Sequence, residues 1–188
     1  MKNLKSIIVL TLISVCFVSC SDDDINPLPV NEEEVITTLI VTLNPVGSGT
    51  TVTMESRDLD GDGPNPPVIE VSSAFQMNTV YEASLELLNE TVDPAESITA
   101  EIEEEDDEHQ FFYTSSNDLV STSYLDADDD GNPIGLLFSL TTTSDGTANF
   151  TVILRHEPNK AAEGVSSGDI TNAGGETDIA ITFPISIE

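Results

Sequence analysis

The chain has 188 residues and a formal net charge of −30, because 35 acidic residues face only five lysines and arginines. This balance argues against nucleic-acid binding, which uses basic surfaces to neutralise phosphate, and against charge attraction to anionic lipid. It leaves cation binding, basic partners and plain solubility as roles for the acidic surface.

The N-terminal segment has the pattern of a secretory signal. Lys2 and Lys5 precede an apolar run, Ile7–Val18, which is followed by a small residue and Cys20. A positive start, a short apolar core and a small residue before the cut are typical of such signals. The run is too short for a transmembrane helix, which needs about 20 residues. We therefore predict that residues 1–19 are a signal peptide.

Cysteine usage gives Cys20 a special role. The chain has two cysteines, and Cys16 would be removed with the signal peptide. A cysteine directly after the cut resembles the bacterial lipobox, in which the thiol is lipidated and becomes the new N-terminus. We predict lipidation at Cys20, which leaves the folded part without a thiol for a disulfide, a metal site or a nucleophile.

Residues 20–34 form an acidic segment with two prolines, which we expect to be a flexible tether. Its start, Cys20-Ser21-Asp22-Asp23-Asp24, resembles the export signal of Bacteroidota surface lipoproteins. The resemblance implies a small acidic lipoprotein that is exported, anchored by lipid to the outer membrane and exposed at the cell surface. Proteins of this kind are often accessories to TonB-dependent uptake of nutrients or metals, so a TonB-dependent receptor is an expected partner.

Residues 35–188 have the texture of one β domain. Short runs rich in Val, Ile, Thr and aromatic residues are separated by clusters of Gly, Pro, Asn and Asp. We predict a mainly β fold, an antiparallel immunoglobulin-like β-sandwich with one short helix. The expected strands are Val35–Leu43, Thr50–Arg57, Pro67–Ser72, Thr79–Leu88, His109–Ser115, Leu119–Leu125, Ile134–Thr143, Thr147–His156 and Thr177–Ile187.

Local patterns add two hairpins and the helix. The strands that flank residues 44–49 form one expected hairpin, and those that flank Ser144-Asp145-Gly146 form the other. Asp93 is an N-cap candidate before a proline at the first helical position, which predicts a helix over residues 94–105. The last strand has apolar residues at every second position over residues 179–187, as a half-buried strand does.

Two segments share the pattern D-x-D-x-D-G, which can bring several carboxylate oxygens to one calcium ion. Calcium is therefore the expected cofactor, although both segments lack the glutamate that closes an EF-hand loop. The competing interpretation is that Asp and Gly simply form turns in an acidic chain, and both interpretations stay open. The candidate ligands are Asp58, Asp60 and Asp62 in the first segment and Asp126, Asp128 and Asp130 in the second.

An alternative metal site lies where an acidic run meets a histidine. Residues 101–108 contain seven carboxylates, which repel one another and favour a solvent-exposed or cation-bound surface. His109 follows at once and could hold a transition metal together with Glu105 or Glu108. His156 ends a separate predicted strand and joins this site if the two strands are adjacent. The competing interpretation is a plain surface histidine at a strand edge.

No catalytic machinery is recognisable in the sequence. Residues 164–168 match G-x-S-x-G by chance, because both histidines precede them and the alternating strands and helices of a hydrolase are missing. Residues 157–176 have no apolar period and form either a binding loop or a surface excursion. We expect a non-enzymatic, lipid-anchored binding module of the cell envelope with no nucleic-acid partner. The alternative is a structural or adhesive surface domain whose loops are rigidified by calcium.

Overall fold

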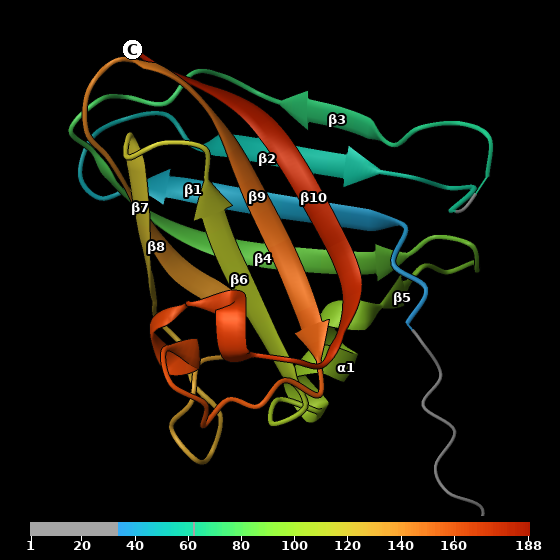
Figure 1. Ribbon diagram of the computed structural model, residues 1–188. Coiled ribbons are helices and arrows are strands. Elements are labelled where there is room, and N and C mark those ends of the chain that lie inside the picture. Colours follow the sequence, from blue (N-terminus) through green and yellow to red (C-terminus); the bar gives the residue numbers. More distant parts are fainter. Residues whose placement is uncertain (1–33, 62) are drawn as a thin grey trace, which may run out of the picture. The chain divides into compact units, whose positions relative to one another are not determined.

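The computed structural model describes residues 34–188 except residue 62, so the predicted signal peptide, Cys20 and Asp62 lie outside the described residues. The strands in chain order are β1 (Thr38–Pro45), β2 (Val52–Arg57), β3 (Val68–Val71), β4 (Val80–Asn89), β5 (Glu96–Ser97), β6 (His109–Ser115), β7 (Val120–Tyr124), β8 (Leu137–Thr142), β9 (Gly146–His156) and β10 (Glu176–Ile187). They form two sheets with antiparallel pairing (Figure 1). The larger has the order β3-β2-β1-β4-β8-β7, with β5 attached to β4, and the smaller has the order β10-β9-β6.

The two sheets lie face to face, and the smaller sheet crosses in front of the larger one in Figure 1. Alternate residues of each strand point into the core, as the pleat of a strand requires. Leu39 and Val41 of the larger sheet and Phe150 and Val152 of the smaller sheet are all buried in one apolar cluster. This architecture confirms the predicted mainly β fold with antiparallel sheets and one α-helix. The predicted hairpin around residues 44–49 is confirmed as well, since β1 and β2 are paired.

The hairpin predicted at Ser144-Asp145-Gly146 is wrong, because the strands that flank this turn belong to different sheets. β8 pairs with β4 and β7, whereas β9 pairs with β6 and β10. Both strands bury alternate residues, and the turn lays these two faces against each other across the core. The rings of Phe138 and Phe150 stack there with their centroids 6.3 Å apart. Because burial of both apolar faces is favourable, the turn connects the two sheets and does not form a hairpin within one sheet.

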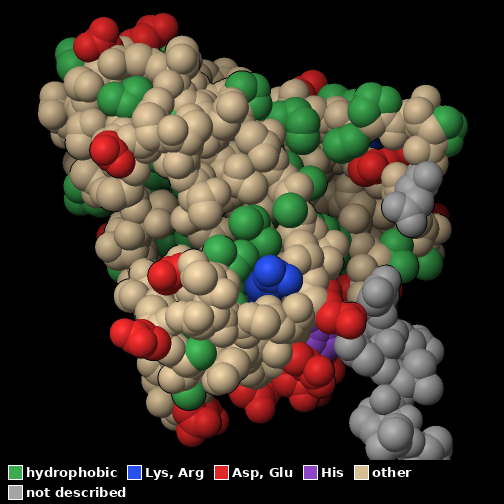
Figure 2. Space-filling model, in the orientation of Figure 1, with side chains coloured by type: hydrophobic (Ala, Val, Ile, Leu, Met, Phe, Trp, Pro, Cys, Tyr) green, Lys and Arg blue, Asp and Glu red, His purple; other side chains and the backbone are tan. Residues whose placement is uncertain are grey.

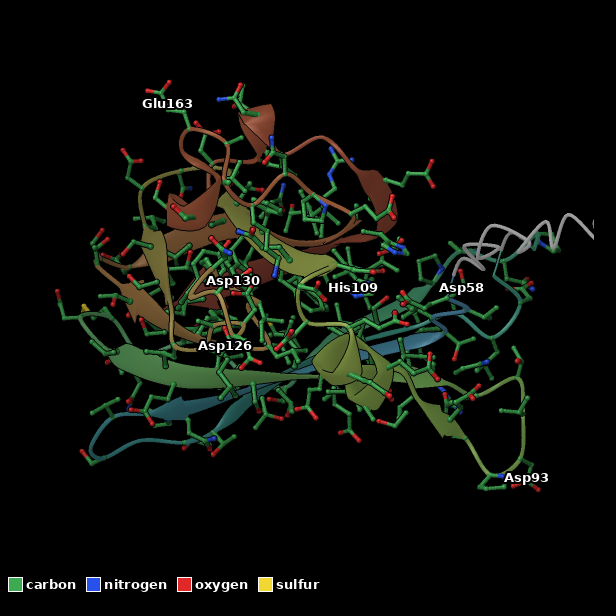
Figure 3. All side chains as sticks on the ribbon, turned by 90° about the horizontal axis from the view of Figure 1, so that it is seen from below. Asp58, Asp93, His109, Asp126, Asp130 and Glu163 are labelled. Atoms are coloured by element: carbon green, nitrogen blue, oxygen red, sulfur yellow. The ribbon has the colours of Figure 1, made fainter. Side chains whose placement is uncertain are left out.

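The helix begins later than the sequence predicts. α1 spans Ile98–Glu104, and its N-cap is Ser97, whose side chain accepts a hydrogen bond from the Ala100 amide. Glu96 and Ser97 pair with the end of β4, so their backbone groups serve the sheet and not a first helical turn. The predicted cap at Asp93 is therefore wrong, and Figure 3 shows Asp93 at the tip of a loop. No helix within residues 34–188 is long and apolar enough to cross a bilayer.

The segment after β9 packs on the outer face of the smaller sheet. It contains two short 3-10 helices, η1 (Val165–Ser167) and η2 (Ile170–Asn172). Val165 and Ala173 form a second buried apolar cluster with Phe112 of β6. The side-chain amide of Gln110 donates a hydrogen bond of 3.0 Å to the Val165 carbonyl. This segment is thus part of the packed structure, because it covers a face of the sheet that would otherwise expose Phe112.

Candidate metal centre

The two histidines meet at the end of the smaller sheet. His109 is the first residue of β6, His156 is the last residue of β9, and the two are direct partners across the strands. Their rings stack with centroids 4.7 Å apart and an interplanar angle of 29°. The alternation of β9 places His156 on the core side, in series with Leu154 and Val152. His109 is fully buried and His156 is 4% exposed, so neither is a plain surface histidine.

The ring of His109 has a fixed orientation. Its Nδ1 lies 3.1 Å from the carbonyl oxygen of Glu105, which is the residue that caps the C-terminal end of α1. A carbonyl can only accept, so Nδ1 carries the proton and donates it. Histidines that bind metals usually hold their second nitrogen in this way, which leaves Nε2 available as the ligand atom.

A buried carboxylate faces this available nitrogen. Oε1 of Glu34 lies 3.0 Å from Nε2 of His109, and the Glu34 side chain is 9% exposed. When the ring is protonated these two atoms form an ion pair, although within the described part of the chain Nε2 of His109 has no well-aligned hydrogen bond. Oε2 of Glu34 is likewise buried without one among these residues. Unsatisfied polar atoms of this kind are rare in protein interiors and call for an explanation.

Asp178 reaches the histidines through an irregularity in β10. Thr177 pairs with Arg155 and Ile179 pairs with Leu154, so Asp178 is the extra residue of a β-bulge. A bulge bends its strand and re-aims a side chain, and such bulges are common beside functional sites. Asp178, His109 and His156 can each offer one ligand atom, and these atoms lie within 4.8 Å of one another.

Gly175 allows β10 to start this close to the histidines. Its φ is +68°, a backbone conformation that L side chains rarely adopt. A Cβ atom at Gly175 would lie 2.2 Å from the carbonyl oxygen of His156. Only glycine therefore fits between the end of β9 and the strand that carries Asp178.

Two further groups of possible ligands overlap with this one. Glu34 and Glu105 form a group with His109, while Glu108 and Glu157 form a group with His156, again with ligand atoms within 4.8 Å. Oε2 of Glu108 lies 3.7 Å from Nε2 of His156. Figure 2 shows the location on the surface, where a small patch of histidine atoms borders acidic side chains at the lower edge of this view. Each residue of the alternative site predicted from the sequence thus belongs to one of these overlapping groups, with Glu105 beside His109 and Glu108 beside His156.

The electrostatics of the cluster favour a positive charge at His109. Burial lowers the pKa of this histidine, but the adjacent Glu34 carboxylate, the Glu105 carbonyl and the charge of Asp178 outweigh that effect. The pKa of His109 is therefore raised overall, since its cationic form is the one that these neighbours stabilise.

In the second aspartate segment, the carboxylates of Asp126 and Asp128 accept hydrogen bonds from other groups of the protein. Both oxygens of Asp126 accept backbone hydrogen bonds of 2.7 Å, one from Gly135 and one from Leu137. Oδ1 of Asp128 accepts from the Asn132 amide at 2.7 Å, and its Oδ2 accepts from the Lys160 ammonium at 3.0 Å. The negative charge of Asp128 is therefore balanced by the Lys160 ammonium.

The other aspartates of the two segments are spread out. Oδ2 of Asp60 accepts a hydrogen bond of 2.7 Å from the side chain of Asn65, and Asp58 and Asp130 lie in separate loops on opposite sides of His109 in Figure 3. Leaving aside Asp62, no three carboxylates of either segment come within mutual ligand distance. Calcium binding at these segments stays a prediction.

Three possible ligands escape sequence reasoning, namely Asp178, Glu34 and Glu157. The alternation of the last strand assigns Asp178 to the solvent side, and the bulge that redirects it has no local sequence signal. Glu34 and Glu157 are ordinary acidic residues in an acidic chain. Glu157 directly follows His156, whereas Glu34 precedes β1 and reaches His109 only in the folded chain. Comparisons with known proteins add no further assignment, because no protein family, curated protein or solved structure matches this chain.

Proposed function

We propose that this protein is a non-enzymatic binding module of the cell envelope that captures a divalent transition metal at His109, His156 and Asp178. The observation that carries the proposal is the buried pair of stacked histidines, directly opposed across β6 and β9, with Asp178 within ligand distance of both. Two imidazoles and a carboxylate suit zinc or a neighbouring metal better than calcium, which prefers oxygen ligands alone.

The geometry of the cluster is compatible with such an ion. Ligand atoms around a tetrahedral zinc ion stand about 3.3 Å apart, since each lies roughly 2.0–2.1 Å from the metal. The three ligand atoms here lie within 4.8 Å of one another, so small side-chain rotations bring them into range. An ion between Nε2 of His109 and the Glu34 carboxylate would also satisfy the buried atoms that have no hydrogen bond. Three protein ligands leave a fourth position for Glu34, for water or for a group from a partner.

Capture and not catalysis is proposed because the histidines are enclosed. His109 and His156 are buried, and the groove that borders the site, of about 430 Å³, is lined by Glu34 and Asp178 and by neither histidine. A substrate in that groove would contact carboxylates and the apolar edge of β10 without reaching the imidazoles. An enclosed site that holds a small ion is the simpler match to this shape.

The test is a calorimetric titration of the metal-free protein with Zn²⁺ and, separately, with Ca²⁺. We expect one zinc ion per chain and little or no heat from calcium. Asp178→Asn should weaken zinc binding by more than about 100-fold, beyond the range typical of residues that only support a ligand. Asp130→Asn, which removes a charge from an exposed loop residue, is the matched control and should bind zinc normally. Zinc binding that survives Asp178→Asn would contradict the assignment, and a calcium site lost in Asp130→Asn would favour a calcium-rigidified structural domain.

We also propose that the module is attached to the outer membrane by a lipid on Cys20, exposed at the cell surface, and an accessory to TonB-dependent uptake. The support for this is the sequence of the N-terminal segment, with its lysines, apolar run and acidic start after Cys20. A captured metal ion would be a fitting cargo for such a partner.

Cys20→Ser is expected to move the protein from the membrane fraction to the soluble fraction, because the lipid is its proposed means of attachment. Fractionation of cells that produce the natural or the substituted chain measures this, with Cys16→Ser as the control that leaves the attachment intact. Retention of the Cys20→Ser protein in the membrane fraction would contradict lipid anchoring.

A further inference from the structure

A second, exposed set of ligands shares His156 with the buried one. Glu108, His156 and Glu157 each offer a ligand atom, and these atoms lie within 4.8 Å of one another. Glu108 and Glu157 are exposed, whereas His156 is buried together with His109. His156 is thus the point at which a solvent-facing group of carboxylates meets the enclosed site.

The backbone places both glutamates by continuing the ladder of β6 and β9. The Glu157 amide donates a hydrogen bond of 2.7 Å to the Glu108 carbonyl, one step beyond the paired histidines. Strict alternation would point residue 157 to the face opposite His156. Glu157 instead has a φ of +49°, which is uncommon for a residue other than glycine. This left-handed conformation turns the chain and brings the Glu157 carboxylate back beside the ring of His156.

A left-handed residue of this kind carries a backbone cost of order 1–3 kcal/mol and tends to persist at functional sites. Nothing about the turn itself requires a glutamate, since glycine or asparagine would adopt the same φ more readily. Glu157 therefore combines a backbone conformation that its type disfavours with a carboxylate next to a proposed metal ligand.

We infer that the metal ion reaches the buried site in two stages, first bound by Glu108, Glu157 and His156, and then passed inward to His109 and Asp178 while His156 remains bound. This inference rests on the proposed function. A hydrated divalent ion would exchange waters for exposed carboxylates at low cost, because these groups are already solvated and negatively charged. Keeping one imidazole bound throughout means that the ion is never released to water on its way in. The inner ligands then complete the shell, with Glu34 next to them.

The inference predicts a particular kinetic pattern. A residue that acts only on the route changes the rates of binding and release by the same factor, since both directions cross the same barrier. A permanent ligand instead raises the release rate and weakens the equilibrium affinity. Rate measurements can therefore distinguish whether Glu108 and Glu157 act only on the route or are permanent ligands.

The experiment is stopped-flow measurement of Zn²⁺ binding to the metal-free protein and of Zn²⁺ release to a fluorescent chelator. We expect Glu108→Gln/Glu157→Gln to slow both processes by about tenfold, because the lost intermediate stage lies on the way in and on the way out; for binding, this factor is at the lower end of what electrostatic focusing gives to association rates. The matched control is Glu103→Gln/Glu104→Gln, which removes the same charge from exposed residues of the same acidic run and lies outside the three ligand groups. This control should change each rate by less than about twofold.

Each outcome has a distinct meaning. Equal slowing of binding by both double variants, without slower release, would overturn the staged route, because general attraction by the acidic surface would then explain the effect. Faster release with weaker affinity in Glu108→Gln/Glu157→Gln would also overturn it, because the glutamates would then be permanent ligands. Failure of the unmodified protein to bind zinc would instead contradict the proposed function itself.

Discussion

Replacing Lys160 with methionine is expected to lower the free energy of unfolding by about 3–5 kcal/mol, because the buried Asp128 carboxylate then loses its cation. The Lys160 and Asp128 side chains are 6% and 2% exposed, and Nζ lies 3.0 Å from Oδ2. Nζ also donates a hydrogen bond to the Asp106 carbonyl, so the lysine joins three separate segments of the chain. Urea unfolding followed by circular dichroism, with a metal chelator present, measures the change.

Two comparisons make this prediction specific. Arg57→Met removes a cation from an exposed pair with Glu90 and should change stability little, because solvent screens that pair. Asp128→Asn/Lys160→Met removes both buried charges and should cost less than the sum of the single substitutions, since neither charge is left alone. A cost below about 1 kcal/mol for Lys160→Met would show that the buried charge is compensated in another way.

The same pair predicts a dependence of stability on pH. Burial on its own would raise the pKa of Asp128, but the Lys160 ammonium and the Asn132 donors outweigh it, so the pKa is lowered. The stabilisation is therefore fully present above the unfolded-state pKa of about 3.9 and is lost as the pH falls through the lower folded-state value. The difference in stability between the unmodified protein and Asp128→Asn should accordingly shrink below about pH 4.

Saturating zinc is expected to stabilise the fold by about 4 kcal/mol when the free ion is at 1,000 times its Kd. For a domain of this size, such a gain corresponds to a rise in Tm of roughly 8–16 °C. The ligands come from β6, β9 and β10, so a bound ion would join all three strands of the smaller sheet. Thermal unfolding with and without Zn²⁺ measures the rise.

His156→Gln should abolish most of this zinc-dependent rise. Because the measured quantity is the difference between zinc-loaded and metal-free samples of each variant, it stays informative even if the substitution lowers the Tm of the metal-free protein. Asp145→Asn, at the turn between β8 and β9, is a control that should keep the full rise. An equal rise in His156→Gln would place the bound zinc elsewhere in the chain.

The strands of this fold are predictable because a half-buried strand imposes a period of two on its own sequence. His109–Ser115 matches β6, and most other expected strands shift by only one to three residues. The partner of a strand is less visible, as the turn at Ser144-Asp145-Gly146 shows. A short turn between two amphipathic strands suits a hairpin and a connection between sheets equally, and only the packing of Phe138 on Phe150 distinguishes them.

The candidate site is predictable in part for the same reason. His109, Glu105 and Glu108 are neighbours in sequence, so their proximity could be foreseen, and His156 joins them once β6 and β9 are adjacent. Asp178 and Glu34 come from distant segments whose placement depends on the assembled sandwich. The pairing of Lys160 with Asp128 is likewise not predictable from the sequence, because 32 residues separate the two.

The bulge at Asp178 has an evolutionary consequence. Thr177 faces Arg155 and Ile179 faces Leu154, and these two partners are consecutive in β9, so a strand without Asp178 would form an uninterrupted ladder with every other pairing preserved. Insertion of a single codon into an ordinary edge strand is therefore enough to add a carboxylate beside the two histidines. A sandwich of this kind could gain or lose the proposed third ligand in one mutational step without any rearrangement of its core.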